Sequence, residues 1–329
     1  MIKNLVLAGA QLKGVCYIGV IRALEELNMI DNIQNVLGIS SGSLIGLAIC
    51  LGFSSQSLEN MVIKLDIENL KEFQTDSIFK LFYTYGMDSG NKIEKLIRVI
   101  LKKKTGSEEI TFRQLKELFP NKNLIVGGSN LSNAEMEYFS ADNTPDMPVY
   151  LAIRISTSFP FVFEKVEYND CIYLDGGLMN NYPIEYFDDS SENTIGISTS
   201  SSNSKNKDLS SFDKYMVQII YILSSQTERY MSKKHKEKSI VIELNYRYDS
   251  IDFSLDMKKY LIEEGYNQFM TKIKEKNTFQ EEIQEENIDN NTISSTDIDV
   301  IGDVVKDLMD IVSGENQNLP DIEEIVNES

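Results

Sequence analysis

The feature that most constrains the fold is a tight, glycine-flanked turn between an apolar strand and an apolar helix. The turn reads Gly38-Ile39-Ser40-Ser41-Gly42, with strand-like residues 33–37 before it and helix-like residues 44–51 after it. Gly38 and Gly42 allow a sharp turn and close packing of strand on helix. A G-x-S-x-G sequence in this position is typical of an elbow that presents a nucleophilic serine, here Ser40. The alternative is that Ser40 and Ser41 only cap the helix.

A second glycine-bearing loop lies near the N-terminus. Residues 4–8 predict a first strand and residues 15–27 a helix, and the loop between them consists of Gly9, Ala10, Gln11, Leu12, Lys13 and Gly14. A loop of this kind directs several backbone N–H groups to one point, beside the positive end of a helix dipole. That is the arrangement of an oxyanion hole. The alternative is an ordinary strand-to-helix connection.

A third feature is Asp175-Gly176-Gly177, which follows a strand-like segment at 171–173. Asp-Gly is usually a turn signal, but a carboxylate can also activate a serine. Two catalytic schemes are therefore open: a Ser40–Asp175 dyad, or a triad that adds His235, the single histidine of the chain. The triad would follow the chain order of α/β-hydrolases. Against it, only one strand precedes the strand of the elbow, and the lysines around His235 oppose the imidazolium that must form.

The alternation of strands and helices along the chain predicts an α/β fold, with a mostly parallel central sheet flanked by helices. We expect further helices at 55–66, 91–103, 111–119, 148–157, 212–232 and 255–273, and further strands at 124–127, 136–139, 194–197 and 240–244. The segment 199–209 is polar and is predicted to be mobile.

Charge divides the chain into two parts. The net charge is −19, and residues 277–329 hold fifteen acidic side chains and one basic one. We expect a globular domain at 1–275 and an acidic, partly disordered tail at 276–329. The tail would begin with a linker at 277–295 and contain one amphipathic helix at about 297–313, which either docks on the domain or binds a protein partner. Nucleic acid is excluded as a partner because phosphate binding needs a basic face.

The three cysteines lie in apolar segments, which predicts buried free thiols in a reducing compartment. One histidine and no cysteine cluster predict no metal site. No apolar run is long enough for a transmembrane helix, and Gln11 and Lys13 interrupt the N-terminal apolar stretch, so no signal peptide is expected. We therefore expect an intracellular protein, cytoplasmic or peripheral to a membrane. The basic runs 102–104 and 233–238 are interpreted as solvated helix ends, or else as contacts to anionic head groups.

Four blocks of sequence occur in order: the loop and helix at 9–26, the elbow at 38–42, the segment 152–160, and the segment 175–183. Together they resemble the patatin-like phospholipase family, over residues 4–190. The resemblance implies a three-layer sandwich and a lipid acyl hydrolase of phospholipase A type. It also implies that Ser40 is the nucleophile, Asp175 the general base and Gly9–Gly14 the oxyanion loop, with Gly38 and Gly42 shaping the elbow and Gly176 and Gly177 the supporting turn. No cofactor is implied, and the substrate would be a phospholipid or another acyl lipid, met at a membrane surface.

The oxyanion loop departs from the pattern of that family, Gly-Gly-Gly-x-Arg/Lys-Gly. Ala10 and Gln11 stand where glycines are expected, and neither residue adopts a positive φ as readily as glycine does. The alternative function is therefore a catalytically weak or inactive lipid-binding or scaffold protein on the same fold.

Overall fold

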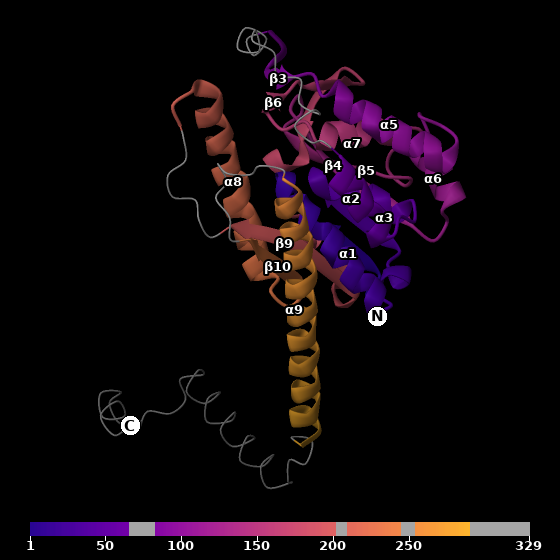
Figure 1. The fold of residues 1–329 in the computed structure, drawn as a ribbon, viewed down its shortest axis with the longest axis vertical. Helices are drawn as coiled ribbons and strands as arrows, with labels where there is room; N and C mark the ends of the chain where they lie inside the picture. Colours follow the sequence, from indigo (N-terminus) through magenta and orange to yellow (C-terminus); the bar gives the residue numbers. More distant parts are fainter. Residues whose placement is uncertain (66–82, 202–208, 245–253, 290–329) are drawn as a thin grey trace, which may run out of the picture. The chain divides into compact units, whose positions relative to one another are not determined.

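The computed structural model describes residues 1–65, 83–201, 209–244 and 254–289 (Figure 1). The chain divides into two compact units, Met1–Ile273 and Lys274–Ser329. The first unit contains the sheet and every site residue predicted from the sequence. Within the described ranges, no helix has the combination of length and apolar content that crossing a membrane would require.

An eight-stranded mixed sheet forms the middle layer, in the order β10-β9-β1-β2-β4-β8-β7, with β5 also paired to β4. The five strands from β10 to β4 in this order run parallel to one another. The other three pair antiparallel: β5 and β8 with β4, and β7 with β8. The bounds are β1 Asn4–Leu7, β2 Asn35–Ile39, β4 Asn123–Asn130, β5 Glu135–Phe139, β7 Val166–Tyr168, β8 Cys171–Asp175, β9 Thr194–Ser201 and β10 Ser239–Leu244. A small second sheet pairs β3 (Gly86–Asp88) with β6 (Phe161–Phe163).

Helices cover both faces of the large sheet, as Figure 1 shows for α1 and α2 on one side and α8 on the other. Alternate residues of β1 point to opposite layers, with Leu5 and Leu7 in one apolar core and Val6 and Ala8 in the other. The expected α/β fold is thereby confirmed. The helices are α1 Cys16–Glu26, α2 Ser41–Cys50, α3 Ser55–Lys64, α5 Asn91–Thr105, α6 Phe112–Leu118, α7 Val149–Ser156, α8 Phe212–Lys234 and α9 Leu255–Asp289, with 3-10 turns at η1 Gln11–Val15, η2 Ile30–Asn32, η4 Gly176–Leu178 and η5 Ile184–Asn193.

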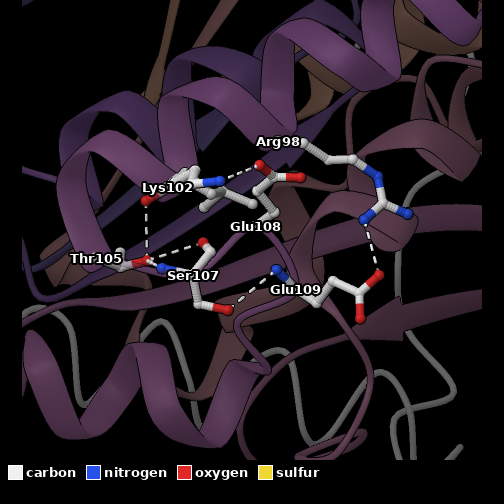
Figure 2. Close-up of polar contacts among 7 residues, drawn as sticks. Arg98, Lys102, Thr105, Ser107, Glu108 and Glu109 are labelled. Atoms are coloured by element: carbon white, nitrogen blue, oxygen red, sulfur yellow. Dashed lines mark hydrogen bonds and ion pairs between the residues drawn. The ribbon is translucent and has the colours of Figure 1, made fainter.

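The C-terminal end of α5 is held by the loop that follows it (Figure 2). Lys102 Nζ lies 2.8 Å from Glu108 Oε1, and Arg98 Nη1 lies 2.9 Å from Glu109 Oε1. The helix ends at Gly106, whose φ of 83° suits a residue without a Cβ. In the basic run 102–104, Lys102 pairs with an acid. Lys104 Nζ lies 4.0 Å from the centre of the Phe53 ring.

Two predicted strand boundaries were wrong. The strand expected at 33–37 runs instead from Asn35 to Ile39, because Ile33 belongs to the preceding turn, where its N–H donates to the Ile30 carbonyl. The segment expected to be mobile from residue 199 is strand through Ser201, which pairs with Leu244. Backbone hydrogen bonding to β10 does not require apolar side chains. Residues 202–208 lie outside the described residues.

The predicted linker at 277–295 was also wrong over most of its length, because α9 continues to Asp289. The stretch 277–289 is rich in Glu and Gln, which are good helix formers, and contains no Pro or Gly to stop the helix. The remaining linker residues and the amphipathic helix expected at 297–313 lie outside the described residues. Of the cysteines, Cys16 and Cys50 are buried as expected, whereas Cys171 is partly exposed at the start of β8.

Candidate active site

The site is assembled where β2 and β8 meet head to head along one edge of β4. The last pair between β2 and β4 is Ile39 with Gly127, and the last pair between β8 and β4 is Asp175 with Gly128. Because β5 occupies the other edge of β4 over residues 126–130, β2 and β8 must share the same edge. They approach from opposite directions, since β2 is parallel to β4 and β8 antiparallel. The residue after β2, Ser40, is thereby placed at the end of β8.

Ser40 sits in a strained turn. Its φ of 51° and ψ of −124° lie in a region that residues with a side chain rarely adopt. Three hydrogen bonds hold it: its N–H donates to Ser156 Oγ at 2.9 Å, and its carbonyl accepts from the N–H and the hydroxyl of Ser43 at 2.9 and 2.6 Å. This backbone conformation is the sharp strand-to-helix turn that an elbow requires.

Both glycines of the elbow are sterically required. A Cβ on Gly38 would lie 2.4 Å from the Gly42 carbonyl oxygen, and a Cβ on Gly42 would lie 2.4 Å from the Leu7 carbonyl oxygen. Each clash is with backbone, which cannot move aside. The glycines at both flanks of the sequence motif therefore allow α2 to pack directly against the ends of β1 and β2.

The Asp175 carboxyl group is buried, with 1% of the residue exposed. Its Oδ1 accepts a hydrogen bond from the Gly177 N–H at 2.7 Å. Burial raises the pKa of Asp175 to about 7, although the Ser40 hydroxyl and the Gly177 amide both favour the charged form. The other oxygen, Oδ2, is buried and has no partner in good hydrogen-bond geometry. Oδ2 therefore has a free lone pair that can receive a proton.

The end of α7 supports both residues, a role that the sequence did not reveal. Ser156 Oγ accepts from the Ser40 N–H, and the Ser158 carbonyl accepts from the Asp175 N–H at 2.9 Å. The buried Arg154 fixes this segment, because its Nη1 donates to Ser158 Oγ at 2.5 Å. These contacts give a physical reason for the block at 152–160, which the sequence offered only as a resemblance.

The predicted oxyanion loop is not an open loop, because η1 begins within it at Gln11. The N–H groups of Gln11 and Leu12, at the start of η1, find no acceptor among the residues that the structure describes. The N–H of Ala10 donates to Ser41 Oγ at 3.0 Å. Of the two positions where glycine was expected, Ala10 has an ordinary φ of −130°, whereas Gln11 has a φ of 52°.

The remaining loop residues serve packing. A Cβ on Gly14 would lie 2.7 Å from Ser41 Oγ, so this glycine allows the loop to contact the elbow. The Lys13 side chain is buried, with its Nζ 5.7 Å from the centre of the Tyr221 ring. The supporting turn forms η4, in which a Cβ on Gly176 would lie 2.6 Å from the Gly127 carbonyl oxygen.

Asn181 contacts the loop, and a second polar residue, Glu228, contacts Asn181. Asn181 Nδ2 donates to the Gly9 carbonyl at 2.8 Å and to Glu228 Oε2 at 2.7 Å. The sequence placed Asn181 in the block at 175–183 without a role. It gave no signal for Glu228, which lies on a helix 188 residues after Ser40.

His235 is engaged elsewhere. It ends α8, where its Nε2 lies 2.7 Å from Glu185 Oε1, and 14% of its side chain is exposed. The expectation of a solvated basic helix end was therefore wrong for this ring. The structure brings Ser40 and Asp175 together without the imidazole. In the described part of the chain, no group of three or more His, Cys, Asp or Glu side chains is placed to hold a metal ion.

Comparisons with known proteins agree with this architecture. The family model described as Patatin-like phospholipase matches residues 5–188. "Uncharacterized protein R571" of Acanthamoeba polyphaga mimivirus is 33% identical over 277 residues, which cover 80% of this chain and 91% of R571. "Probable lipid hydrolase 463L" of Invertebrate iridescent virus 6 is 31% identical over 185 residues, which cover 56% of this chain and 62% of 463L.

Among solved structures, VipD from Legionella pneumophila aligns with a TM-score of 0.54 and 18% identity, covering 82% of this chain and 66% of VipD. That likeness concerns the fold. The family match spans more than half of the chain and includes the elbow, the loop and the Asp-Gly-Gly turn. This chain is a member of the patatin-like phospholipase family.

Proposed function

We propose that this protein hydrolyses acyl esters of lipids through a covalent acyl intermediate on Ser40, with Asp175 as general base. The observation that carries the proposal is the buried Asp175 carboxyl group, which interacts with the hydroxyl of Ser40 on a strained elbow. Membership of the family and the name of the 463L relative support a lipid as substrate. A lipid substrate implies contact with a membrane surface.

The reaction balances with these groups alone. Asp175 takes the Ser40 proton as Oγ attacks the ester carbonyl carbon, and the carbonyl oxygen becomes an oxyanion. The amides of Gln11 and Leu12 are the donors that we assign to that oxyanion. Asp175 then gives the proton to the departing alcohol, and water repeats the steps to release the fatty acid and free Ser40. A carboxyl group with a pKa of about 7 is well matched to both proton transfers near neutral pH.

The test is hydrolysis of a p-nitrophenyl acyl ester and of phosphatidylcholine vesicles by Ser40→Ala and Asp175→Asn variants. We expect both variants to lose at least about 10³-fold in kcat, and the vesicles to yield fatty acid and lysophospholipid. Ser54→Ala is the matched control, because Ser54 caps α3 and lies outside the predicted site. Wild-type turnover by Ser40→Ala would overturn the proposal, and release of the head group instead of a fatty acid would exclude the phospholipase A type.

One alternative has a specific observation in its favour. The Ala10 amide is already bonded to Ser41 Oγ, and Gln11 is held at a φ that costs free energy. These features favour a protein that binds acyl lipids with weak or no turnover. A fluorophosphonate probe distinguishes the two functions, because only an activated Ser40 would be labelled. Vesicle binding without labelling would support the alternative.

A further inference from the structure

A second buried carboxylate, Glu228 of α8, lies outside the proposed dyad. The residue is 7% exposed, and both of its oxygens accept hydrogen bonds. Oε2 accepts from Asn181 Nδ2 at 2.7 Å, and Oε1 accepts from the Thr199 N–H at 3.2 Å. Since both partners are donors, a carboxylate satisfies the site and a side-chain amide cannot, because its NH₂ group would face one of the two donors.

Asn181 links Glu228 to the loop by hydrogen bonds. Its Nδ2 donates to Glu228 and also to the Gly9 carbonyl. The backbone carbonyl of Asn181 accepts from the Gly9 N–H at 3.1 Å. The two acceptors around Nδ2 fix the orientation of the amide, since its Oδ1 could not take that place. Gly9 is therefore held through both its N–H and its C=O.

The Gly9 carbonyl and the Ala10 N–H belong to one planar peptide group. Fixing the carbonyl against Asn181 consequently directs the Ala10 N–H towards Ser41 Oγ, where it is found. That peptide leads directly into Gln11, whose φ of 52° turns the chain into η1. The direction of the Gln11 and Leu12 amides thus depends on how Gly9 is held.

We propose that Glu228 is a positioning residue, which acts through Asn181 and Gly9 to aim the oxyanion amides at the reacting carbonyl. This role rests on the proposed hydrolase function and adds a residue to it. Glu228 touches neither the substrate nor the dyad in this scheme.

The charges around Glu228 support a role for its ionised form. Lys13 of η1 and Arg229 of α8 favour the carboxylate, while Tyr17 of α1 and Tyr182 face it as neutral phenols. Burial outweighs the two cations and raises the pKa of Glu228 to about 7. Protonation places an O–H on an oxygen that must accept, so one of the two hydrogen bonds is lost as the pH falls below 7.

The experiment is the pH dependence of kcat/KM for ester hydrolysis by wild type and Glu228→Gln. In the wild type two carboxylates must be ionised, so below pH 7 log kcat/KM falls with a slope steeper than the value of one for a single proton. Glu228→Gln is expected to show a slope of one. We also expect its kcat to be about 10- to 100-fold lower with KM little changed, because misaimed donors weaken only the transition state.

Ser232→Ala is the matched control. Ser232 lies four residues after Glu228 on α8, is buried, and also links the helix to β9, through Ser198 Oγ at 3.1 Å. Within the described part of the chain, Ser232 makes no hydrogen bond to the loop at 9–14, so the slope and the kcat of this variant should equal those of the wild type. Asn181→Ala provides a second variant in case Glu228→Gln folds poorly, and should give the same slope of one. The double variant should be no slower than the slower single variant.

The outcomes separate the two proposals. If Ser40→Ala is inactive while Glu228→Gln and Asn181→Ala keep the wild-type kcat and slope, the positioning role is wrong and the hydrolase function stands. If Ser40→Ala keeps its activity, the hydrolase function itself is wrong. A loss of kcat in Ser232→Ala equal to that in Glu228→Gln would show that general loosening of α8 is responsible, and would also overturn the positioning role.

Discussion

Asp175 pairs in the sheet with Gly128, one residue beyond the point at which β4 stops pairing with β2. This one-residue step sets the spacing between the proposed nucleophile and the proposed base. Asp175 is the last residue of β8, and Ser40 directly follows the last residue of β2, so the register of these two strands on β4 fixes both positions. The site should therefore be sensitive to small changes in the backbone around this junction.

The first prediction compares two glycines at the junction. A Cβ on Gly176 would meet the Gly127 carbonyl oxygen at 2.6 Å, whereas a Cβ on Gly127 would meet the ends of the flexible Ile39 and Met136 side chains. We expect Gly176→Ala to shift the end of β8 and to lower kcat about 100-fold, since misplacement of about 1 Å has that effect. Gly127→Ala should lower kcat much less. Equal losses in steady-state kinetics would contradict this account.

The second prediction concerns strain at the elbow. Ser40 has a φ of 51°, so Ser40→Gly removes both the hydroxyl and the strain, while Ser40→Ala removes the hydroxyl alone. Both variants should be inactive, but Ser40→Gly should unfold with a free energy higher than that of Ser40→Ala by about 1 kcal/mol. Urea denaturation measures the difference. Identical midpoints would mean that the elbow stores no strain.

The third prediction addresses the unusual loop. Gln11→Gly should stabilise the fold by about 1 kcal/mol, because it relieves the positive φ and removes the buried Gln11 Oε1, which has no hydrogen-bond partner. Ala10→Gly is the control at a position of ordinary φ and should be neutral or destabilising. Thermal unfolding of both variants tests this. A Gln11→Gly protein no more stable than Ala10→Gly would argue against strain in the loop.

The fourth prediction links Asp175 to stability and pH. Because its folded pKa of about 7 lies above the ordinary value of 3.8, the folded state binds the proton more tightly than the unfolded state does. Stability is therefore lost as the pH rises from about 4 to 7, by about 4 kcal/mol at most. Asp175→Asn cannot ionise and should exceed the wild type in unfolding free energy by more at pH 8 than at pH 5. If the difference in unfolding free energy between Asp175→Asn and the wild type became smaller towards pH 8, the raised pKa of Asp175 would be contradicted.

The fifth prediction is that His235→Ala keeps the esterase activity. The ring contacts Glu185 at the end of α8, and the proposed proton transfers do not need it. Its loss should cost about 1 kcal/mol of stability, as expected for a single side-chain hydrogen bond. Steady-state kinetics at pH 8 would check this, and a fall in kcat comparable to that of Asp175→Asn would restore the triad.

Local patterns in the sequence were sufficient to predict the fold class and most elements. The elbow, the Asp-Gly-Gly turn and the capping box, in which Thr111 Oγ1 accepts from the Gln114 N–H, are short-range features with residue-specific chemistry. The end of β9 and the length of α9 were missed for different reasons. Polar residues extend β9 because its partner strand supplies the hydrogen bonds. The extension of α9 to Asp289 passes through a stretch rich in Glu and Gln, which favour the helix.

The supporting contacts of the site could not be predicted. Ser156, Ser158 and Glu228 each act through a partner more than 15 residues away, and nothing in their own neighbourhoods distinguishes them from other buried polar residues. The same holds for Gly127 and Gly128, whose importance comes from the register of three strands around β4. Long-range pairing of this kind is determined by tertiary packing, which a local pattern does not contain.

The head-to-head meeting of β2 and β8 has a consequence during synthesis. The ribosome releases the elbow well before β8, which comes 135 positions later in the chain, and most of β4 must already be in place for β8 to dock against its far half. A partly made chain would hold a serine with no carboxylate to activate it. Under the mechanism that we propose, the nascent protein would be harmless to nearby membranes until the domain is nearly complete.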